Sequence, residues 1–488
     1  MRGAKSPMAI RPETLCALGA DLTRMVADSR HLRAGDVFVA LPGKRHDPRG
    51  DITGAIAAGA AAVIWEEEGF QWRDEWRVPN LPVRGLRKVL GDLVSHALAH
   101  PSRQLWVAGV TGTNGKTSCS QWLARSLTQL GKRAAVIGTL GNGFPGALSP
   151  ASHTTPDVIT LHHLLADFLG QGAAGVAMEV SSHGLEQGRV DGVCFSAALF
   201  TNLTRDHLDY HGSMERYGAA KAKLFAWPTL KHAVVNLDDE FGARLAARLD
   251  RSALEVMGYG LGKGEISGHR LDLSGRGLRL EIETPWGKSE IESQLLGGFN
   301  ASNLLGVLGM LLAAGVNLVD ATGVLSTMQP VAGRLQIVRE GQGPLVVVDY
   351  AHTPDALEKV LQTLADIKPG NARLICVFGC GGNRDPGKRP LMGEIATRLA
   401  DLVVVTSDNP RDEDPMRIID DIIGGAHSNY RVEADRTAAI HSAIEEARPN
   451  DIVLLAGKGH ETYQEMRGAR LPFDDVDVAR QFLRRHHA

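Results

Sequence analysis

The residues with the most direct chemistry lie in a glycine-containing turn between an apolar run and a polar segment. They are Gly112, Thr113, Asn114, Gly115, Lys116 and Thr117. Such a turn lets backbone N–H groups converge on an oxyanion, the following helix N-terminus adds positive potential, and Lys116 supplies a mobile charge. Thr117 stands where phosphate loops have a Mg²⁺ ligand. An ordinary strand–turn–helix connection is the alternative, but the apolar run directly before the turn favours phosphate binding.

A carboxylate and a histidine follow two further apolar runs. Glu179 ends the run GVAME, where a carboxylate costs free energy unless it is paired or bound to a metal. We expect a divalent cation to supply that partner. His207 lies in a loop among several acids, and loop histidines are most often surface or hydrogen-bonded residues. The nearby acids still make metal or phosphate binding a reasonable hypothesis for His207.

A lysine shares a helix face with apolar residues a short distance further on. In the helix expected over residues 214–227, the spacing puts Tyr217, Lys221 and Leu224 on one side and turns Lys223 away. A lysine in that position either snorkels to solvent or is buried with a lowered pKa and available for chemistry. The sequence leaves both alternatives open.

Four apolar runs in the last third of the chain end in unusual polar sequences. These sequences cover residues 349–355, 379–385, 406–411 and 456–461. Because the carboxyl ends of parallel strands meet at one edge of a sheet, we expect these segments to form a single site. Before them, Asn300 and Asn303 precede an apolar helix, and they either cap it or read the edge of a nucleotide base.

The elements that position these residues belong to an α/β protein of about three domains, since a chain of 488 residues is too long to fold around a single hydrophobic core. Residues 1–100 read as a small α/β domain. Residues 101–330 alternate strands and helices, as a mostly parallel phosphate-loop sheet does, and change to a period of two between 267 and 295, which predicts an antiparallel portion. Residues 331–488 read as a Rossmann-like domain.

Composition excludes several classes of protein. A net charge of -3 gives no sign of a nucleic-acid partner, and five scattered cysteines with no CxxC pair favour neither a disulfide framework nor a zinc site. The N-terminus lacks the apolar region of a signal peptide, and residues 304–316 are too short to span a membrane. We therefore expect a cytoplasmic protein without a membrane span.

The motifs together resemble the Mur ligase family. They are Thr111–Thr117, Glu179, Ser181–Gly184, Asn202–His211, Gly333–Arg334, Asp349–Pro354 and Asp408–Arg411. The resemblance covers essentially the whole chain. The loop of this family reads TGTNGK followed by Ser or Thr, which explains why Val110 stands where general phosphate loops have glycine.

The resemblance implies an ATP-dependent ligase that adds meso-diaminopimelate to UDP-N-acetylmuramoyl-L-Ala-D-Glu in peptidoglycan precursor synthesis. The γ-phosphoryl group of ATP would move to the terminal carboxylate of the UDP substrate, and the amine of the amino acid would attack the resulting acyl phosphate. The chemistry is consistent, because phosphorylation gives a poor electrophile a leaving group while Mg²⁺ and lysine neutralise the developing charge.

The resemblance also implies roles for individual residues. Lys116, Lys221 and His207 would be catalytic, and Thr117, Glu179, His207 and Lys221 would hold Mg²⁺. Lys221 matches the lysine that this family carbamylates with CO₂, and a carbamate is an anionic oxygen ligand where an ammonium would be repelled. ATP would be held by the six loop residues together with Asn300, Asn303, Arg334 and Asp349.

Two further residue sets follow from the same resemblance. The UDP-muramoyl dipeptide would contact Ser29, Arg30, His153, Thr154, Thr155, Ser182, His183 and Arg189. The amino acid would contact Arg384, Asp408, Asn409, Arg411, Gly457 and Glu461. The family's DNPR sequence accompanies meso-diaminopimelate, whose second carboxylate Arg411 can grip bidentately where lysine would leave it unpaired.

Three alternatives remain in view. A ligase of the same fold could act on L-lysine or folylpolyglutamate, and the DNPR and GKGHE sequences argue against the folate substrate. A nucleotide-dependent switch would not need the four polar strand ends. A non-catalytic UDP-sugar-binding relative would not need Lys116, Glu179, His207 and Lys221 together. We expect small-molecule substrates and a monomer.

Overall fold

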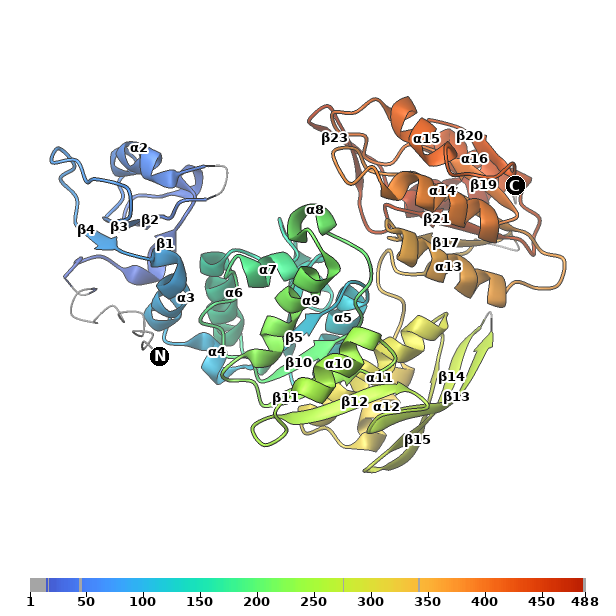
Figure 1. The fold of residues 1–488 in the computed structure, drawn as a ribbon, viewed down its shortest axis with the longest axis horizontal. Helices are drawn as coiled ribbons and strands as arrows, with labels where there is room; N and C mark the ends of the chain where they lie inside the picture. The colour runs from blue at the N-terminus through green and yellow to red at the C-terminus, as the bar shows by residue number, and fades with distance from the viewer. Residues whose placement is uncertain (1–14, 16, 44–45, 275, 341–342, 486–488) are drawn as a thin grey trace.

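The computed structural model describes residues 15, 17–43, 46–274, 276–340 and 343–485, and its main sheets lie in three successive parts of the chain (Figure 1). The first part has a parallel sheet in the order β1-β2-β3-β4. Its elements are β1 (Met25–Val26), β2 (Val37–Ala40), α2 (Ile52–Ala57), β3 (Ala62–Glu66), β4 (Asn80–Val83) and α3 (Leu86–Ala97), with short 3₁₀ turns at Leu22–Arg24, Ser29–His31 and Pro48–Asp51. Alternate residues of β2 pack toward α3 and toward α2, so both faces of the strand are buried.

The second part is an eleven-stranded sheet in the order β15-β14-β13-β12-β11-β10-β5-β9-β6-β7-β8. Its parallel strands are β5 (Trp106–Thr111), β6 (Ala134–Gly138), β9 (Gly175–Glu179), β10 (Ala197–Phe200), β11 (His232–Asn236) and β12 (Glu255–Leu261). The antiparallel strands predicted between 267 and 295 are present as β13 (Ile266–Ser274), β14 (Gly277–Thr284) and β15 (Gly287–Ser293). A hairpin of β7 (Gly141–Phe144) and β8 (Ala147–Ser149) completes the other edge.

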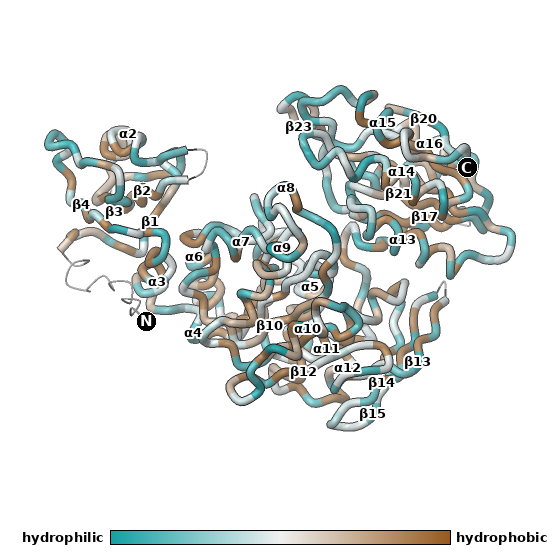
Figure 2. The backbone as a smooth tube through the Cα atoms, in the orientation of Figure 1, coloured by the Kyte–Doolittle hydropathy of each residue, from teal (hydrophilic) through white to brown (hydrophobic). Residues whose placement is uncertain are grey.

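Helices cover both faces of this sheet and leave the carboxyl ends of its strands open. The helices are α4 (Pro101–Gln104), α5 (Lys116–Gln129), α6 (Val158–Gly170), α7 (Ser182–Glu186), α8 (Leu208–His211), α9 (Met214–Ala222), α10 (Glu240–Arg248), α11 (Gly298–Ala313) and α12 (Leu318–Ser326). One core lies under α5, α11 and α12, and a second lies under α6 and α10. The apolar run at 304–316 is thus mostly α11, a buried helix, and Figure 2 shows its hydrophobic colouring.

The third part is a doubly wound sheet in the order β16-β17-β21-β18-β19-β20, antiparallel only at β16. Its strands are β16 (Gln336–Val338), β17 (Leu345–Asp349), β18 (Leu374–Phe378), β19 (Leu402–Val405), β20 (Tyr430–Val432) and β21 (Ile452–Ala456). Helices α13 (Pro354–Asp366), α14 (Lys388–Leu399) and α15 (Pro415–Ile423) cover one face, and α16 (Arg436–Glu446) and α17 (Asp475–Arg485) cover the other. A small hairpin, β22 (Tyr463–Met466) and β23 (Ala469–Pro472), follows β21.

One local prediction is wrong, and one of the alternatives that the sequence left open is excluded. The helix expected over 214–227 ends at Ala222 and continues as a 3₁₀ turn, Lys223–Ala226. Neither Asn300 nor Asn303 caps α11, because the cap position is Gly297 and both asparagines lie inside the helix. Within the described part of the chain, no helix is both long and apolar enough to span a bilayer.

Candidate active site

The glycine turn lies between the end of β5 and the start of α5, and its shape requires glycine. Gly112 has φ +150° and Gly115 has φ +86°. A Cβ on Gly112 would lie 1.9 Å from Thr201 Oγ1, and one on Gly115 would lie 2.6 Å from Asn303 Oδ1. The loop is therefore packed directly against the end of β10 and the start of α11, which holds its backbone N–H groups in place.

Two lysines of this loop region share one backbone acceptor. Lys116 Nζ donates to the carbonyls of Gly112 (2.9 Å) and Thr113 (2.8 Å), and Lys221 Nζ donates to the same Gly112 carbonyl (2.7 Å). Burial, and next the charge of Lys116, hold the pKa of Lys221 well below its usual value. Lys221 is 1% exposed and lies over the Tyr217 ring at 4.4 Å, so the snorkelling alternative is wrong.

Glu179 is buried at the end of β9, beside the start of α5. Its carboxylate accepts hydrogen bonds from Thr117 Oγ1 (3.0 Å), from the Thr139 N–H (2.8 Å) and from Thr139 Oγ1 (3.2 Å). A Cβ on Gly138 would lie 2.3 Å from Glu179 Oε1. Hydroxyl and amide donors thus supply the partners that sequence reasoning assigned to a cation alone, and they fix the carboxylate next to the Thr117 hydroxyl.

His207 lies in a left-handed turn, φ +53°, before α8. Its Nε2 is 3.3 Å from Asp206 Oδ2, and its ring meets the ring of His183 at 4.8 Å. Burial lowers the pKa of His207, and Asp206 opposes that shift. Among the residues that the structure describes, no group of three or more His, Cys, Asp or Glu side chains could hold a metal ion. The four residues predicted to hold Mg²⁺ nevertheless line one cavity.

That cavity, with a volume of about 350 Å³, is closed on its other side by the third part of the chain. Arg334 lies with its guanidinium 4.5 Å from the centre of the Tyr350 ring and donates to Thr117 Oγ1 at 3.4 Å. Asp349 accepts from the Leu335 N–H at 2.7 Å, and burial raises its pKa. Arg334, Asp349 and Asn303 all line the cavity. Asn300 lies behind Asn303, whose amide donates to it at 3.3 Å.

A second cavity of about 540 Å³ adjoins the first, and all six residues predicted to contact the amino acid line it. These residues are Arg384, Asp408, Asn409, Arg411, Gly457 and Glu461. The two cavities share Asp206, His207, Tyr350 and His352 in their walls. A ligand in the first cavity therefore lies next to a ligand in the second, with His207 at the junction.

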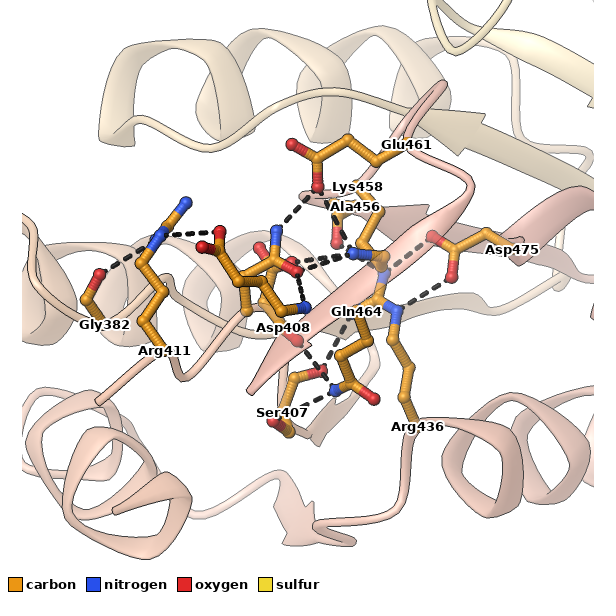
Figure 3. Close-up of polar contacts among 12 residues, drawn as sticks. Gly382, Ser407, Asp408, Arg411, Arg436, Ala456, Lys458, Glu461, Gln464 and Asp475 are labelled. Carbon is orange, nitrogen blue, oxygen red and sulfur yellow. Dashed lines mark hydrogen bonds and ion pairs between the residues drawn. The ribbon is translucent and has the colours of Figure 1, made fainter. Parts of the chain in front are cut away.

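The floor of the second cavity is a connected polar network (Figure 3). Asn409 Nδ2 donates to Glu461 Oε2 at 2.7 Å, and Arg411 donates to Glu465 Oε2 (3.2 Å) and to the Gly382 carbonyl (2.9 Å). Arg411 has φ +52°, an uncommon conformation for a side chain of this size, which is often found at functional sites. Contacts from two other segments of the chain therefore fix the direction of the Arg411 side chain.

The residues predicted for the UDP substrate fall into two separate groups. Thr154, Thr155, Ser182 and Arg189 belong to the second part of the chain. Thr155 Oγ1 donates to the Glu179 carbonyl (2.9 Å) at the end of β9, and Arg189 donates to the Thr155 carbonyl (2.8 Å). Thr154 contacts Thr139, and Ser182 contacts His211. The His183 ring contacts the His207 ring edge to face, and His153 is exposed.

Ser29 and Arg30 lie apart from that group, in the 3₁₀ turn Ser29–His31 between β1 and β2 of the first part of the chain. Ser29 Oγ donates to Asp51 Oδ2 at 3.4 Å, and Arg30 pairs with Asp28 while its side chain stays 84% exposed. The described structure therefore brings the predicted UDP-substrate residues together only in part, with Ser29 and Arg30 on a separate surface.

Sequence reasoning missed several residues of the site. Lys458 is wholly buried among Asp408, Asn409 and Glu461, and Glu465 pairs with Arg411. Lys458 and Glu461 both belong to the GKGHE sequence that was recognised after β21, so their positions were available from the sequence. Asp408 and Asn409 follow β19, and Glu465 lies in the β22–β23 hairpin, so no local pattern places them beside Lys458 and Arg411.

Family models match nearly the whole chain. They are the Mur ligase family, catalytic domain (residues 21–97), the Mur ligase middle domain (110–311) and the Mur ligase, glutamate ligase domain (333–459). The first and third of these matches contain the four-stranded and six-stranded sheets, and the second begins within β5 of the eleven-stranded sheet.

Relatives of known name are similar over their full length. A protein of Chromobacterium violaceum is 54% identical over 97% of this chain and 96% of its own, and one of Neisseria meningitidis is 50% identical over 96% of each. Both are named UDP-N-acetylmuramoyl-L-alanyl-D-glutamate–2,6-diaminopimelate ligase. A solved structure with that name is 39% identical, with a TM-score of 0.68 over 95% of each chain. The MurF ligase from Thermotoga maritima in complex with ADP, 20% identical with a TM-score of 0.65 over 96% of this chain and 98% of its own, is similar in fold alone.

Proposed function

This chain belongs to the Mur ligase family, and we propose that it joins meso-diaminopimelate to UDP-N-acetylmuramoyl-L-Ala-D-Glu at the expense of ATP. It is an ATP-dependent ligase of peptidoglycan precursor synthesis, as its relatives are. The observation that carries the substrate assignment is the junction of two cavities at His207, one lined by the phosphate loop and the other by Arg411 and Glu461. A ligase that must bring an acyl phosphate to an amine needs this arrangement.

In this proposal the phosphate loop and the third part of the chain hold ATP from opposite sides. The loop N–H groups bind the phosphates. When ATP binds, the Lys116 ammonium gives up its hydrogen bonds to the loop carbonyls and donates to phosphate oxygens instead. Asn303, Arg334 and Asp349 face the rest of the nucleotide, because they line the same cavity. Asn300 acts through Asn303, since its amide oxygen accepts the Asn303 hydrogen bond.

The oxygen ligands at and beside Thr117 suit Mg²⁺. The Thr117 hydroxyl and the Glu179 carboxylate, 3.0 Å apart, are the hard oxygen ligands that Mg²⁺ prefers, and His207 lines the same cavity. When bound, the cation would neutralise charge on the transferring phosphoryl group. Thr139 holds the Glu179 carboxylate toward Thr117 through two hydrogen bonds.

We propose that Lys221 carries a carbamate formed with CO₂. The neutral amine adds to the carbon of CO₂ and then loses a proton, which leaves an anionic carboxylate on Nζ. Burial and the adjacent Lys116 favour the neutral amine that this step requires. A carbamate would also replace the close approach of two ammonium groups at the Gly112 carbonyl with an attraction to Lys116.

The substrate carboxylate and the amino acid would meet at His207. Thr154, Thr155, Ser182, His183 and Arg189 would hold the dipeptide end of the UDP substrate beside Glu179, which leaves its uridine end for Ser29 and Arg30. Domains at 1–100, 101–330 and 331–488 would then bind UDP, ATP and the amino acid respectively. We also propose that the protein is a cytoplasmic monomer.

Arg411 and Glu461 would select the amino acid. Arg411 pairs with Glu465 through Nε and with the Gly382 carbonyl through Nη1, which orients the guanidinium toward the cavity for a second carboxylate. Glu461 lines the same cavity and would meet a second ammonium group. L-Lysine lacks that second carboxylate, so it would offer Arg411 no substrate carboxylate to bind.

The test is phosphate release from ATP with UDP-N-acetylmuramoyl-L-Ala-D-Glu, measured with meso-diaminopimelate, with L-lysine and with neither. We expect turnover with meso-diaminopimelate and a product whose mass equals the two substrates minus water. Turnover with lysine alone, or without any amino acid, would overturn the proposal.

A further inference from the structure

Lys458 is a buried charge beneath the amino-acid cavity, and the mechanism above does not use it. Its side chain is 0% exposed. Its Nζ donates to Asn409 Oδ1 (3.1 Å) and Glu461 Oε2 (3.2 Å) and lies 3.6 Å from Asp408 Oδ1. One ammonium thus contacts three residues that line the cavity, from behind them (Figure 3).

These contacts fix which way the Asn409 amide points. Its oxygen accepts from Lys458 and from the Glu465 N–H (2.8 Å), while its nitrogen donates to Glu461 Oε2 (2.7 Å). A flipped amide would set its NH₂ group against two donors and its oxygen against a carboxylate. Lys458 therefore holds Asn409 and Glu461 in a single arrangement.

The same ammonium balances charge. Asp408 and Glu461 are two carboxylates, and Lys458 offsets one of them, which leaves one net negative charge at the cavity floor. Asp408 Oδ1 is buried and has no hydrogen-bond partner of its own. A buried acceptor of this kind is costly unless a ligand or an ion pair satisfies it.

We propose that Lys458 is a positioning residue for the amino-acid substrate. Its ammonium fixes Asn409 and Glu461 and leaves the acid pair with one unbalanced negative charge, which suits the second ammonium group of a diamino acid. This inference rests on the proposed function, because it concerns the cavity assigned there to the amino acid. It adds the requirement of a buried ammonium beneath the cavity, from a residue that does not itself line the cavity.

The variant that tests the inference is Lys458→Met, which keeps the unbranched side chain, one atom shorter, and removes its charge and donors. We expect the KM for meso-diaminopimelate to rise roughly tenfold or more, since a buried charged hydrogen-bond network loses its centre. The KM for ATP should not change, and kcat should fall much less. Lys458→Gln retains a donor for Asn409 without the charge and should show a smaller rise in KM.

A pH profile separates positioning from a general structural role. Burial and next Asp408 raise the pKa of Glu461, and Lys458 opposes that shift. Arg436, Tyr350 and Tyr463 also lie near Glu461, and Arg411, Glu465 and Arg470 line the same cavity. Without Lys458 the pKa of Glu461 rises further, so the carboxylate is protonated more readily as pH falls. The KM of Lys458→Met for the amino acid should therefore rise as pH falls, over a range in which the wild-type KM is flat.

A matched control is Lys368→Met, which removes a lysine paired with Asp401 at the edge of the same sheet, and its kinetics should equal those of the wild type. An unchanged or pH-independent KM in Lys458→Met would overturn the inference while wild-type turnover kept the proposed function intact. Failure of both Lys458 variants to fold would show a structural role and would also overturn it. Absence of wild-type turnover with meso-diaminopimelate would overturn both the function and the inference.

Discussion

Two ammonium groups that converge on one carbonyl oxygen define the chemistry of this site at the scale of residues. Lys116 and Lys221 both donate to the Gly112 carbonyl, from a loop and from a helix that are far apart in sequence. Like charges so close in a buried setting favour a neutral form of one of them. Lys221, the more enclosed of the two, is the group that this arrangement prepares for modification.

Replacement of Lys221 by alanine tests that account. We expect activity to fall on the order of a hundredfold, because the cavity loses an anionic ligand beside Thr117 and Glu179. A short-chain carboxylate such as formate should restore part of it by occupying the vacated space. Lys223→Ala, which removes an exposed lysine paired with Glu186 on the adjoining turn, is the control and should remain near wild type. Full activity in Lys221→Ala, or no rescue by carboxylates, would contradict the carbamate.

The role of a residue was predictable from sequence where it depends on neighbours along the chain. It was not predictable where it depends on side chains that are distant in sequence. The phosphate loop is continuous in the chain, so its residues could be named. The two donors that Thr139 gives to Glu179, and the place of Lys458 beneath Asn409, depend on segments that meet only in the fold. No spacing in the sequence reports those contacts.

At the scale of elements, a buried ion pair ties together the two strands that carry the amino-acid site. Arg436 at the start of α16 pairs with Asp475 at the start of α17, and both side chains are 0% exposed. Arg436 also donates to the Ala456 carbonyl (3.0 Å) at the end of β21 and to the Ser407 carbonyl (3.4 Å) beyond the end of β19 (Figure 3). Arg436 thereby links the carboxyl ends of β19 and β21.

Arg436→Met should loosen both strand ends. Removal of one partner leaves Asp475 as an uncompensated buried charge, which costs about 3–5 kcal/mol in local stability. Hydrogen exchange of β19 and β21 in the full chain should report that loss as faster opening. Replacing both partners, as Arg436→Met with Asp475→Leu, should recover most of the protection. Unchanged exchange in the single variant would show that the ion pair does not hold these strands.

The elements themselves were predictable where the hydrophobic pattern is strong. Strands such as β9, β10 and β11 are buried on both faces and read as continuous apolar runs. The β7–β8 hairpin was missed, since Gly141 and Gly143 weaken any strand pattern and it lies at the sheet edge. The α9 helix was predicted too long, because a 3₁₀ turn keeps nearly the same periodicity for one further turn.

At the scale of the whole molecule, the cavity that we propose for ATP is lined by both the second and the third parts of the chain. Asn114 of the phosphate loop donates to Asp355 Oδ2 of α13 at 3.0 Å, and Arg334 reaches Thr117. Figure 1 shows α13 on the side of the third part that faces α5 and α11. The resemblance already assigned residues from both parts to one ATP site, but the sequence does not show the contacts, such as Asn114–Asp355, that join the two parts.

Asp355→Ala should weaken that closure. Loss of one hydrogen bond between the parts is expected to raise the KM for ATP about threefold to tenfold. Small-angle scattering in the presence of ATP should show a larger radius of gyration than for the wild type. Asp366→Ala, at the other end of α13, is the control. Equal ATP kinetics and equal scattering in the two variants would mean that the Asn114–Asp355 contact does not stabilise the closed form.

The central claim is that one site, built from two parts of the chain, activates a carboxylate by phosphorylation and then transfers it to an amine. The direct measurement uses UDP-N-acetylmuramoyl-L-Ala-D-Glu labelled with ¹⁸O in its terminal carboxylate, and follows the label during ligation of meso-diaminopimelate. An acyl phosphate leaves one oxygen of that carboxylate on the released phosphate, so we predict one labelled phosphate for each amide formed. Unlabelled phosphate, or label transferred to AMP, would contradict the account.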